Sequence, residues 1–409
     1  MHVIPAQIGV TVNLNEQPCP EISGSSIMQA NKLKWIVIFM IIKLDGCIDP
    51  FYPQIIDNQQ SLVIEGLITN QEGYHYIRIS RSAPYDNPKN IPEQNCQVEV
   101  IDKKGNGIQF YESEPGLYEQ WIEQEYLKTG NQYKLNVITT NGKYESRYET
   151  LLPCPPIENV YYEIVTKETS DSRFPIYGIQ FYTDLYAPGE NAKYYRWELI
   201  ETWEYHAEYM IRFYYDGELH DLGYYSDSLY YCWLTKPVQE IYTATIQHVS
   251  GDSLYKIPLG FVSNETDRLK IKYSLLVKQY SLNDTAYQYW NQVKKQNQET
   301  GGLYEIQPTQ LKGNIYNLNN EDEVVLGYFN VSSLSEKRIM IDESFQFFQP
   351  VSECQLEDIR RLDWLPVAKL PVNLVSVSRT SRGPWQTAQK HCFDCTVLGG
   401  TTKKPDFWE

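Results

Sequence analysis

A group of residues near the carboxyl end has types and spacing that could bind a metal ion. Cys392 and Cys395 are three positions apart, His391 precedes them, and Cys354 lies upstream. Thiolate and imidazole are the ligands of structural zinc, but such sites normally use two closely spaced ligand pairs, and here only one pair is present. The leader described below indicates export, and an oxidising compartment favours disulfides over thiolates. We therefore expect disulfides here, and neither a metal nor another cofactor.

Several disulfide connectivities are possible. The candidates are Cys96, Cys154, Cys232, Cys354, Cys392 and Cys395, and an even set of this kind allows about fifteen pairings. Cys96 shares strand parity with Val98 and Val100, so it should face a core, and Cys154 ends the same predicted unit. This favours a bridge between Cys96 and Cys154. Cys392 and Cys395 could bridge to each other or reach Cys232 and Cys354.

No catalytic constellation is visible. The zinc-protease, nucleophile-elbow, phosphate-loop and dinucleotide motifs are absent. Histidines 75, 206, 220, 248 and 391 are scattered along the sequence. The acidic run Glu321-Asp322-Glu323 follows two asparagines and is typical of a solvated turn, with a calcium site as the alternative. Carboxylates are too plentiful for a glycosidase-like pair to be informative. We expect that the protein is not an enzyme.

An apolar run near the amino end indicates where the protein resides. Residues 32–47 read KLKWIVIFMIIKLDGC. Eight helical residues extend only about 12 Å, too short to span a bilayer core of about 30 Å. Lysines before an apolar centre are instead typical of a secretory signal, and Leu44-Asp45-Gly46-Cys47 resembles a bacterial lipobox. Lipid on Cys47 would anchor the protein to a membrane. The alternative is a short buried segment with a chance cysteine.

Size and charge set further limits. Residues 1–27 are polar and proline-containing, so we expect translation to start at Met28. Removal of residues 1–46, which carry three basic and three acidic residues, leaves the net charge at −16. A strongly acidic protein without a basic stripe is not expected to bind nucleic acid.

The remaining sequence predicts a mainly β fold of two β-sandwich domains of the immunoglobulin or fibronectin type. Alternating segments separated by turn signals such as Asn141-Gly142 are typical of strands. One amphipathic helix is predicted over about 282–298, with Ser281 and Asp284 as a capping box. The predicted organisation is a tether at 47–58, a first sandwich at 59–154, a larger second one at 155–350, and an irregular region at 351–409.

The 34 tyrosines allow three interpretations. Aromatic residues favour strands and half-buried surfaces, so packing is the simplest explanation. Pairs such as Tyr194-Tyr195 and Tyr224-Tyr225 straddle both faces of a strand, so only one member of each can face a core. The other should face solvent, a protein partner or a sugar.

Several stretches together resemble one known family. They are the lipobox with CIDPFYPQI, then LVIEGLITN, IRISRSAPY, the segment from Tyr273 to Asn317, EVVLGYFNVSSLSEKRI and the ending CFDCTVLGGTTKKPDFW. In order and spacing they are similar to the Bacteroidota lipoproteins of the domain-of-unknown-function family 4249. The resemblance implies an outer-membrane lipoprotein with an immunoglobulin-like amino-terminal part, encoded beside TonB-dependent transporters. It implies no catalytic residues. Lys43 before the lipobox is atypical, and Cys96 and Cys154 look like additions.

From this resemblance we expect a non-enzymatic accessory of a TonB-dependent outer-membrane transporter, anchored through Cys47. Acidic residues after the cysteine, here Asp49 and Asp57, favour the cell surface over the periplasmic face. Phe407 and Trp408, in a glycine-preceded tail, form a possible partner surface, or the tail folds back onto an open sheet edge. The alternative function is a stand-alone glycan- or peptide-binding lipoprotein, and a hydrolase is a third.

Lipidation at Cys47 can be tested directly. Cells fed labelled palmitate should incorporate the label into this protein, because the thiol of Cys47 receives the diacylglycerol. An unlabelled protein in the cytosol with reduced thiols would contradict the prediction. The intact mass of the precursor shows in addition whether translation begins at Met28.

Overall fold

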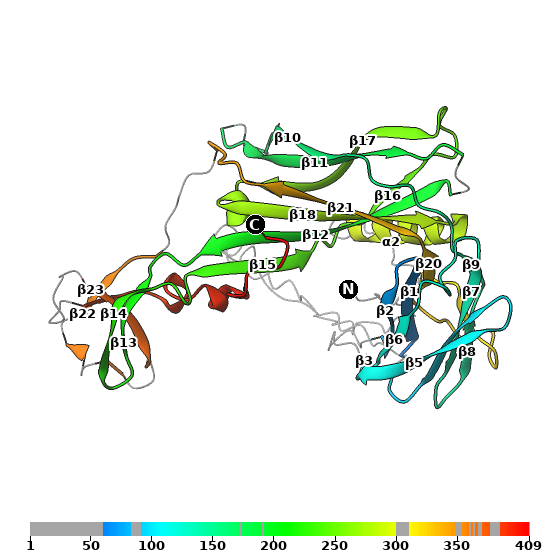
Figure 1. Ribbon diagram of the computed structural model, residues 1–409, viewed down its shortest axis with the longest axis horizontal. Coiled ribbons are helices and arrows are strands. Elements are labelled where there is room, and N and C mark those ends of the chain that lie inside the picture. Colours follow the sequence, from blue (N-terminus) through cyan, green and yellow to red (C-terminus); the bar gives the residue numbers. More distant parts are fainter. Residues whose placement is uncertain are drawn as a thin grey trace, which may run out of the picture.

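The computed structural model describes residues 60–82, 91–171, 173–189, 192–299, 311–347, 354–359, 361–362, 365–366, 370–376 and 385–408. The leader, Cys47 and the tether lie outside these residues. The described chain is mainly β, with several sheets and one α-helix (Figure 1). No helix in this part of the chain is long and apolar enough to cross a bilayer.

The first unit contains an eleven-stranded sheet around one core. Its strands β1–β9 are Leu62–Thr69, Gly73–Arg81, Ile91–Pro92, Gln97–Asp102, Gly107–Glu114, Leu117–Ile122, Gln132–Ile138, Lys143–Ser146 and Glu149–Thr150. Alternation of buried and partly exposed residues, as in β4, explains why these segments pair as strands. The hairpin at Asn141-Gly142 forms, but neither residue has the positive φ of the type I′ turn. The Thr139 hydroxyl instead accepts the backbone N–H groups of both.

Two strands from far along the chain complete the first unit. β19 (Ile315–Asn317) pairs with β8, and β20 (Phe329–Ser332) pairs in parallel with β1. Phe329 is fully buried in this core, and a side chain on Gly66 would press against its ring. The prediction that residues 155–350 all belong to the second unit is therefore wrong for 315–332. These residues cover sheet edges that would otherwise be unpaired.

The central unit consists of two sheets on either side of a second core. One sheet contains β10 (Val160–Lys167), β11 (Ile176–Tyr186) and β17 (Ser253–Ser263). The other contains β12 (Tyr194–His206), β15 (Tyr231–Pro237), β16 (Tyr242–Thr245), β18 (Lys272–Leu282) and β21 (Leu334–Ile341). Phe181 and Tyr273 stack with ring centroids 5.8 Å apart, so aromatic packing joins the two sheets.

The predicted helix is present as α2 (Asp284–Glu299) and packs beside β12 and β16. The Arg196 guanidinium lies 4.1 Å from the Trp290 ring centroid, a cation–π contact between sheet and helix. The predicted cap is wrong in position. The side chain of Asn283 accepts the N–H of Ala286 at 2.8 Å, whereas Ser281 is in β18 and donates to the Leu152 carbonyl. The strand extends through the position where the sequence suggested a cap.

The carboxyl-terminal region is not irregular as predicted. β22 (Glu357–Ile359), β23 (Val372–Ser376) and β24 (Trp385–Thr387) form a sheet with β13 (Ile211–Tyr215) and β14 (Leu219–Ser226), in the order β14-β13-β23-β24-β22. This sheet, which we call the arm, projects from the central unit away from the first unit (Figure 1). Strands of three to five residues give too short a period to be recognised in sequence.

A buried carboxylate joins the first unit to the segment around α2. Glu149, 3% exposed, accepts hydrogen bonds from Asn314 at 2.9 Å and from the Tyr328 hydroxyl at 2.9 Å, and a third from the Asn283 amide. Burial raises the pKa of Glu149, and these donors lower it in part. The three donors come from α2's cap and from the segment that returns to the first unit.

Replacing Glu149 should loosen this junction. Glu149→Ala removes the common acceptor of three donors, two of which (Asn314 and Tyr328) are buried, so the free energy of unfolding should fall by about 2–4 kcal/mol in urea titrations. Glu149→Gln should lower the free energy of unfolding by less than Glu149→Ala. The glutamine carbonyl can still accept hydrogen bonds from Asn314 and Tyr328, and only the bond from the Asn283 amide is lost, because the glutamine NH2 group faces it. A raised carboxyl pKa stabilises most at acidic pH, and that contribution is lost as pH rises through the native value. The Gln variant should lack this slope, and Glu321→Gln on the exposed turn should match wild type.

Candidate binding surfaces

The cysteines near the carboxyl end form disulfides. Cys232 of β15 is joined to Cys395, and Cys354 is joined to Cys392. The sequence left two possibilities open for Cys392 and Cys395: a bridge to each other, or bridges to Cys232 and Cys354. The structure has the second. Cys354, His391 and Cys392 are near one another in the described chain. Both cysteines of this cluster are in a disulfide, and so is Cys395, the third cysteine considered as a ligand. These residues therefore offer zinc no thiolate.

The predicted bridge between Cys96 and Cys154 is not formed. Cys96 packs against the core of the first unit, as its parity indicated. Cys154 packs against the core of the central unit, where its sulfur lies 3.4 Å from the Gln279 carbonyl oxygen. The proline-rich segment places Cys154 beyond the first unit, so the two thiols belong to different cores.

The remaining polar candidates do not converge on one site. His75 is buried in β2, His206 contacts Glu204, His220 contacts Asp216, and His391 lies beside Cys392. In the acidic run, Glu323 accepts hydrogen bonds from Tyr144 at 3.0 Å and Asn317 at 2.5 Å. Glu321 and Asp322 are exposed. This arrangement is that of a turn anchored by one carboxylate.

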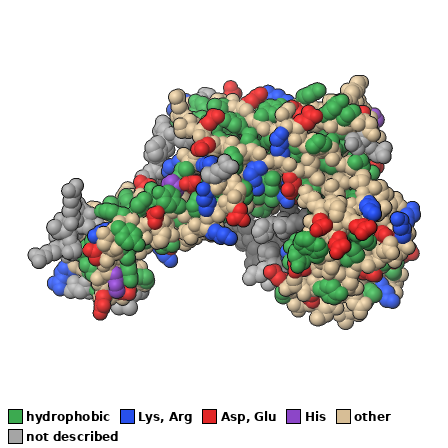
Figure 2. Space-filling view, viewed as in Figure 1, with side chains coloured by type: hydrophobic (Ala, Val, Ile, Leu, Met, Phe, Trp, Pro, Cys, Tyr) green, Lys and Arg blue, Asp and Glu red, His purple; other side chains and the backbone are tan. Residues whose placement is uncertain are grey.

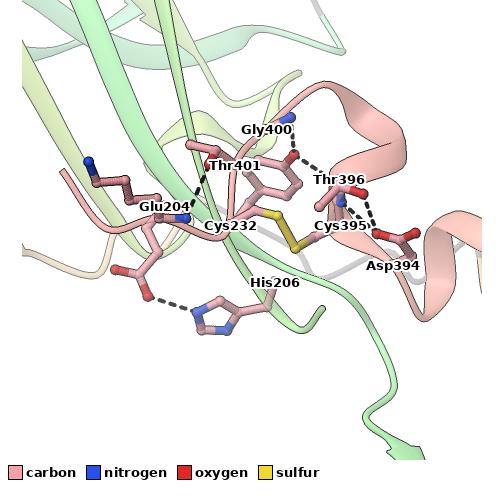
Figure 3. The surroundings of a disulfide bond; sticks show 10 residues. Glu204, His206, Cys232, Asp394, Cys395, Thr396, Gly400 and Thr401 are labelled. Carbon is pink, nitrogen blue, oxygen red and sulfur yellow. Dashed lines mark hydrogen bonds and ion pairs between the residues drawn. A yellow bond between two sulfur atoms is a disulfide. The ribbon is translucent and has the colours of Figure 1, made fainter. Parts of the chain in front are cut away.

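The carboxyl-terminal tail folds back onto the central unit around the Cys232–Cys395 bond (Figure 3). The Tyr205 hydroxyl donates to the Cys395 carbonyl at 2.7 Å and accepts the Gly400 N–H at 3.0 Å. Thr401 and Trp233 exchange two backbone hydrogen bonds of 2.9 Å. The tail thus pairs with β15, the outer strand of its sheet. Of the two interpretations of this tail, the structure has the one in which it covers an open edge.

Both aromatic residues of the tail contact the central unit. Trp408 is 4% exposed, and its ring N–H donates to Glu204 at 3.0 Å, the carboxylate that also contacts His206. Phe407 packs under the Arg338 guanidinium, 3.5 Å from its ring centroid. Trp408 is therefore inaccessible to a partner in this arrangement, and Phe407 is only partly accessible.

A group of exposed aromatic residues lies on the outer face of the first unit. Tyr74, Tyr76, Tyr111 and Trp121 are 57%, 47%, 65% and 47% exposed. Strand register places Tyr74 opposite Trp121, and Glu119 opposite both Tyr76 and Tyr111. These five residues are called the aromatic face below. Figure 2 shows hydrophobic and acidic side chains together over β2 and β6.

Only part of the aromatic face could be predicted from the sequence. Tyr74 and Tyr76 alternate with inward-facing His75 and Ile77, so their outward parity was visible. β6, which carries Trp121, was not predicted, because Glu119 and Gln120 interrupt its apolar pattern. The prediction that at most one tyrosine of each pair faces a core agrees with the structure: Tyr195 is buried beside the partly exposed Tyr194, and Tyr224 and Tyr225 are both exposed.

Trimming the tail tests its role as an edge cover. Deleting residues 399–409 should lower thermal stability, because it removes the pairing with Trp233 and exposes the core around Tyr205. Trp408→Ala alone should cost about 1–3 kcal/mol in urea titrations. Phe407→Ala should cost less, because Phe407 is 37% exposed. A truncated protein as stable as wild type that fails to bind a partner would instead make the tail an anchor.

Comparison with known proteins identifies a family for this chain. The family model described as Domain of unknown function (DUF4249) matches residues 48–338. No curated protein shows a significant match.

Solved structures with some similarity include trypsin-activated alpha-2-macroglobulin from Escherichia coli, at 13% identity over 55% of this chain and 15% of that chain. The FN1–FN3 domains of chicken CNTN1 match at 11% identity over 55% and 62%. Both have TM-scores of 0.18. In each case the alignment spans less than two thirds of the other chain, and similarity at this level does not define the fold.

Proposed function

We propose, from the premise that this chain belongs to the DUF4249 family, that it is a non-enzymatic outer-membrane lipoprotein. Lipid on Cys47 holds it at the cell surface, and its two β units are sandwiches of the immunoglobulin or fibronectin type. It acts as an accessory of a TonB-dependent transporter and helps to capture or pass on the transporter's substrate.

The aromatic face is the observation that carries this proposal. Tyrosine and tryptophan are enriched where proteins bind other proteins, and four of them stand exposed on neighbouring strands. Leu67, which is paired with Tyr76, packs against the cluster formed by Tyr280, Ala286 and Tyr328. Leu67 is therefore covered by this cluster, whereas Tyr76, next to it in the sheet, is the first residue of the exposed aromatic face.

A stand-alone glycan-binding lipoprotein is the second candidate, because exposed aromatic rings also stack on sugars. The geometry of the rings favours a protein partner. Tyr74 and Trp121 meet at an interplanar angle of 86°, edge to face. Two rings at this angle do not form a flat platform for successive sugar rings.

Affinity capture of the lipidated protein tests the accessory role. The tagged full chain, extracted in mild detergent, should recover an outer-membrane barrel transporter, identified by mass spectrometry. Tyr74→Ala with Trp121→Ala should reduce recovery, because buried aromatic anchors account for most of the binding energy at many interfaces.

Tyr255→Ala is the matched control, because Tyr255 is 77% exposed on the central unit. It should leave recovery unchanged. If wild-type protein recovers no barrel but binds an oligosaccharide on a glycan array, the second candidate replaces the first.

A further inference from the structure

The aromatic face is acidic as well as aromatic. Glu119 lies at its centre, between Tyr76 and Tyr111 on the two adjacent strands. Further exposed glutamates lie in the strands of the face or within three residues of their ends, at positions 72, 114, 123 and 125. Neither β5 nor β6 contains a lysine or arginine.

The basic residues of β2 lie to one side of the face. Arg78 is opposite Glu65 in the neighbouring strand and opposite Leu117 in β6. Arg81 forms an ion pair with Glu93 at 2.7 Å. Among the described residues, no cation forms an ion pair with Glu119 or with these four glutamates. The carboxylates of the face therefore have no direct ion-pair partner in the described part of the chain.

Aromatic rings beside uncompensated carboxylates are suited to cations. The negative face of a tyrosine or tryptophan ring attracts an ammonium or guanidinium group within about 6 Å. A carboxylate at hydrogen-bonding distance strengthens that contact. The net charge of −16 adds long-range attraction for a cationic ligand.

We infer that the aromatic face binds an extended, lysine- or arginine-bearing segment of a protein partner. This deepens the proposed function and rests on it for the identity of the partner as a protein. Neighbouring strands are about 4.8 Å apart and alternate residues about 7 Å. The rows Tyr74–Trp121 and Tyr76–Glu119–Tyr111 thus cover the length of about three extended peptide residues, enough for two basic side chains at i and i+2.

A short peptide tests this inference on the full chain purified in mild detergent. The probe is a fluorescent peptide of about six residues in which lysine alternates with serine, with a glutamate–serine peptide as its counterpart. Fluorescence anisotropy should show binding of the lysine peptide, weakened by added salt, and none of the glutamate peptide. Trp121→Ala and Glu119→Gln should each weaken binding about three- to fivefold.

Glu321→Gln and Tyr255→Ala are the controls, because they remove an equal charge and an exposed ring elsewhere, and neither should change the affinity. Binding that survives Trp121→Ala and Glu119→Gln in a folded protein reflects overall charge only and overturns the inference. Absence of lysine-peptide binding to wild type overturns it also. If wild type and the Trp121 variant capture the transporter equally well, the accessory role stands, but the aromatic face is not the surface that binds the partner. If the lysine peptide binds but no transporter is captured, the aromatic face does bind basic segments, but the accessory role is contradicted.

Discussion

Unpaired sheet edges must be covered, and this requirement determines how the chain of this protein is arranged. An open edge presents backbone donors and acceptors to any other strand. Here residues distant in sequence cover these edges: β20 pairs with β1, β19 with β8, and Thr401 with Trp233 of β15. The outermost strands of the first unit are then only three and four residues long. Each of these pairings joins segments that are far apart in the sequence.

These returns also explain the buried polar groups. A chain that leaves the first unit at β9 and re-enters it after α2 must cross the junction twice, and both crossings carry backbone and amide groups. Glu149 is the common acceptor for Asn283, Asn314 and Tyr328, so one carboxylate satisfies donors from three segments. The disulfide between Cys232 and Cys395 similarly fixes the last segment to β15. The units are linked by specific polar and covalent contacts in addition to apolar packing.

Local periodicity predicted most of the elements but none of the pairings of β19 and β20, and the return of the tail was expected only as one of two alternatives. β1, β2, β12 and α2 were predicted within a few residues, since each has a clear two- or 3.6-residue pattern. β17 was missed because Lys256 has a positive φ and its register with β11 is irregular. The pairing of residue 66 with residue 329, or of 233 with 401, cannot be recognised from the residues near either partner, because the partners are far apart in the sequence. The assignment of residues 315–332 to the second unit and the Cys96–Cys154 bridge were wrong, whereas the elements themselves were largely correct.

The same constraint restricts where a partner can bind. In the described chain, the strands at the two ends of the first unit's sheet are β19 and β20, and β3 and β9 pair on one side only. All four have two to four residues, which limits the number of backbone hydrogen bonds that an added strand could form. The tail already occupies the edge of β15 with Trp408 buried behind it. What these coverings leave accessible is a sheet face, and on β2, β5 and β6 that face has large aromatic side chains where solvated strands normally have polar ones. Recognition through side chains on this face, and not through backbone pairing, is the mode that the closed edges favour.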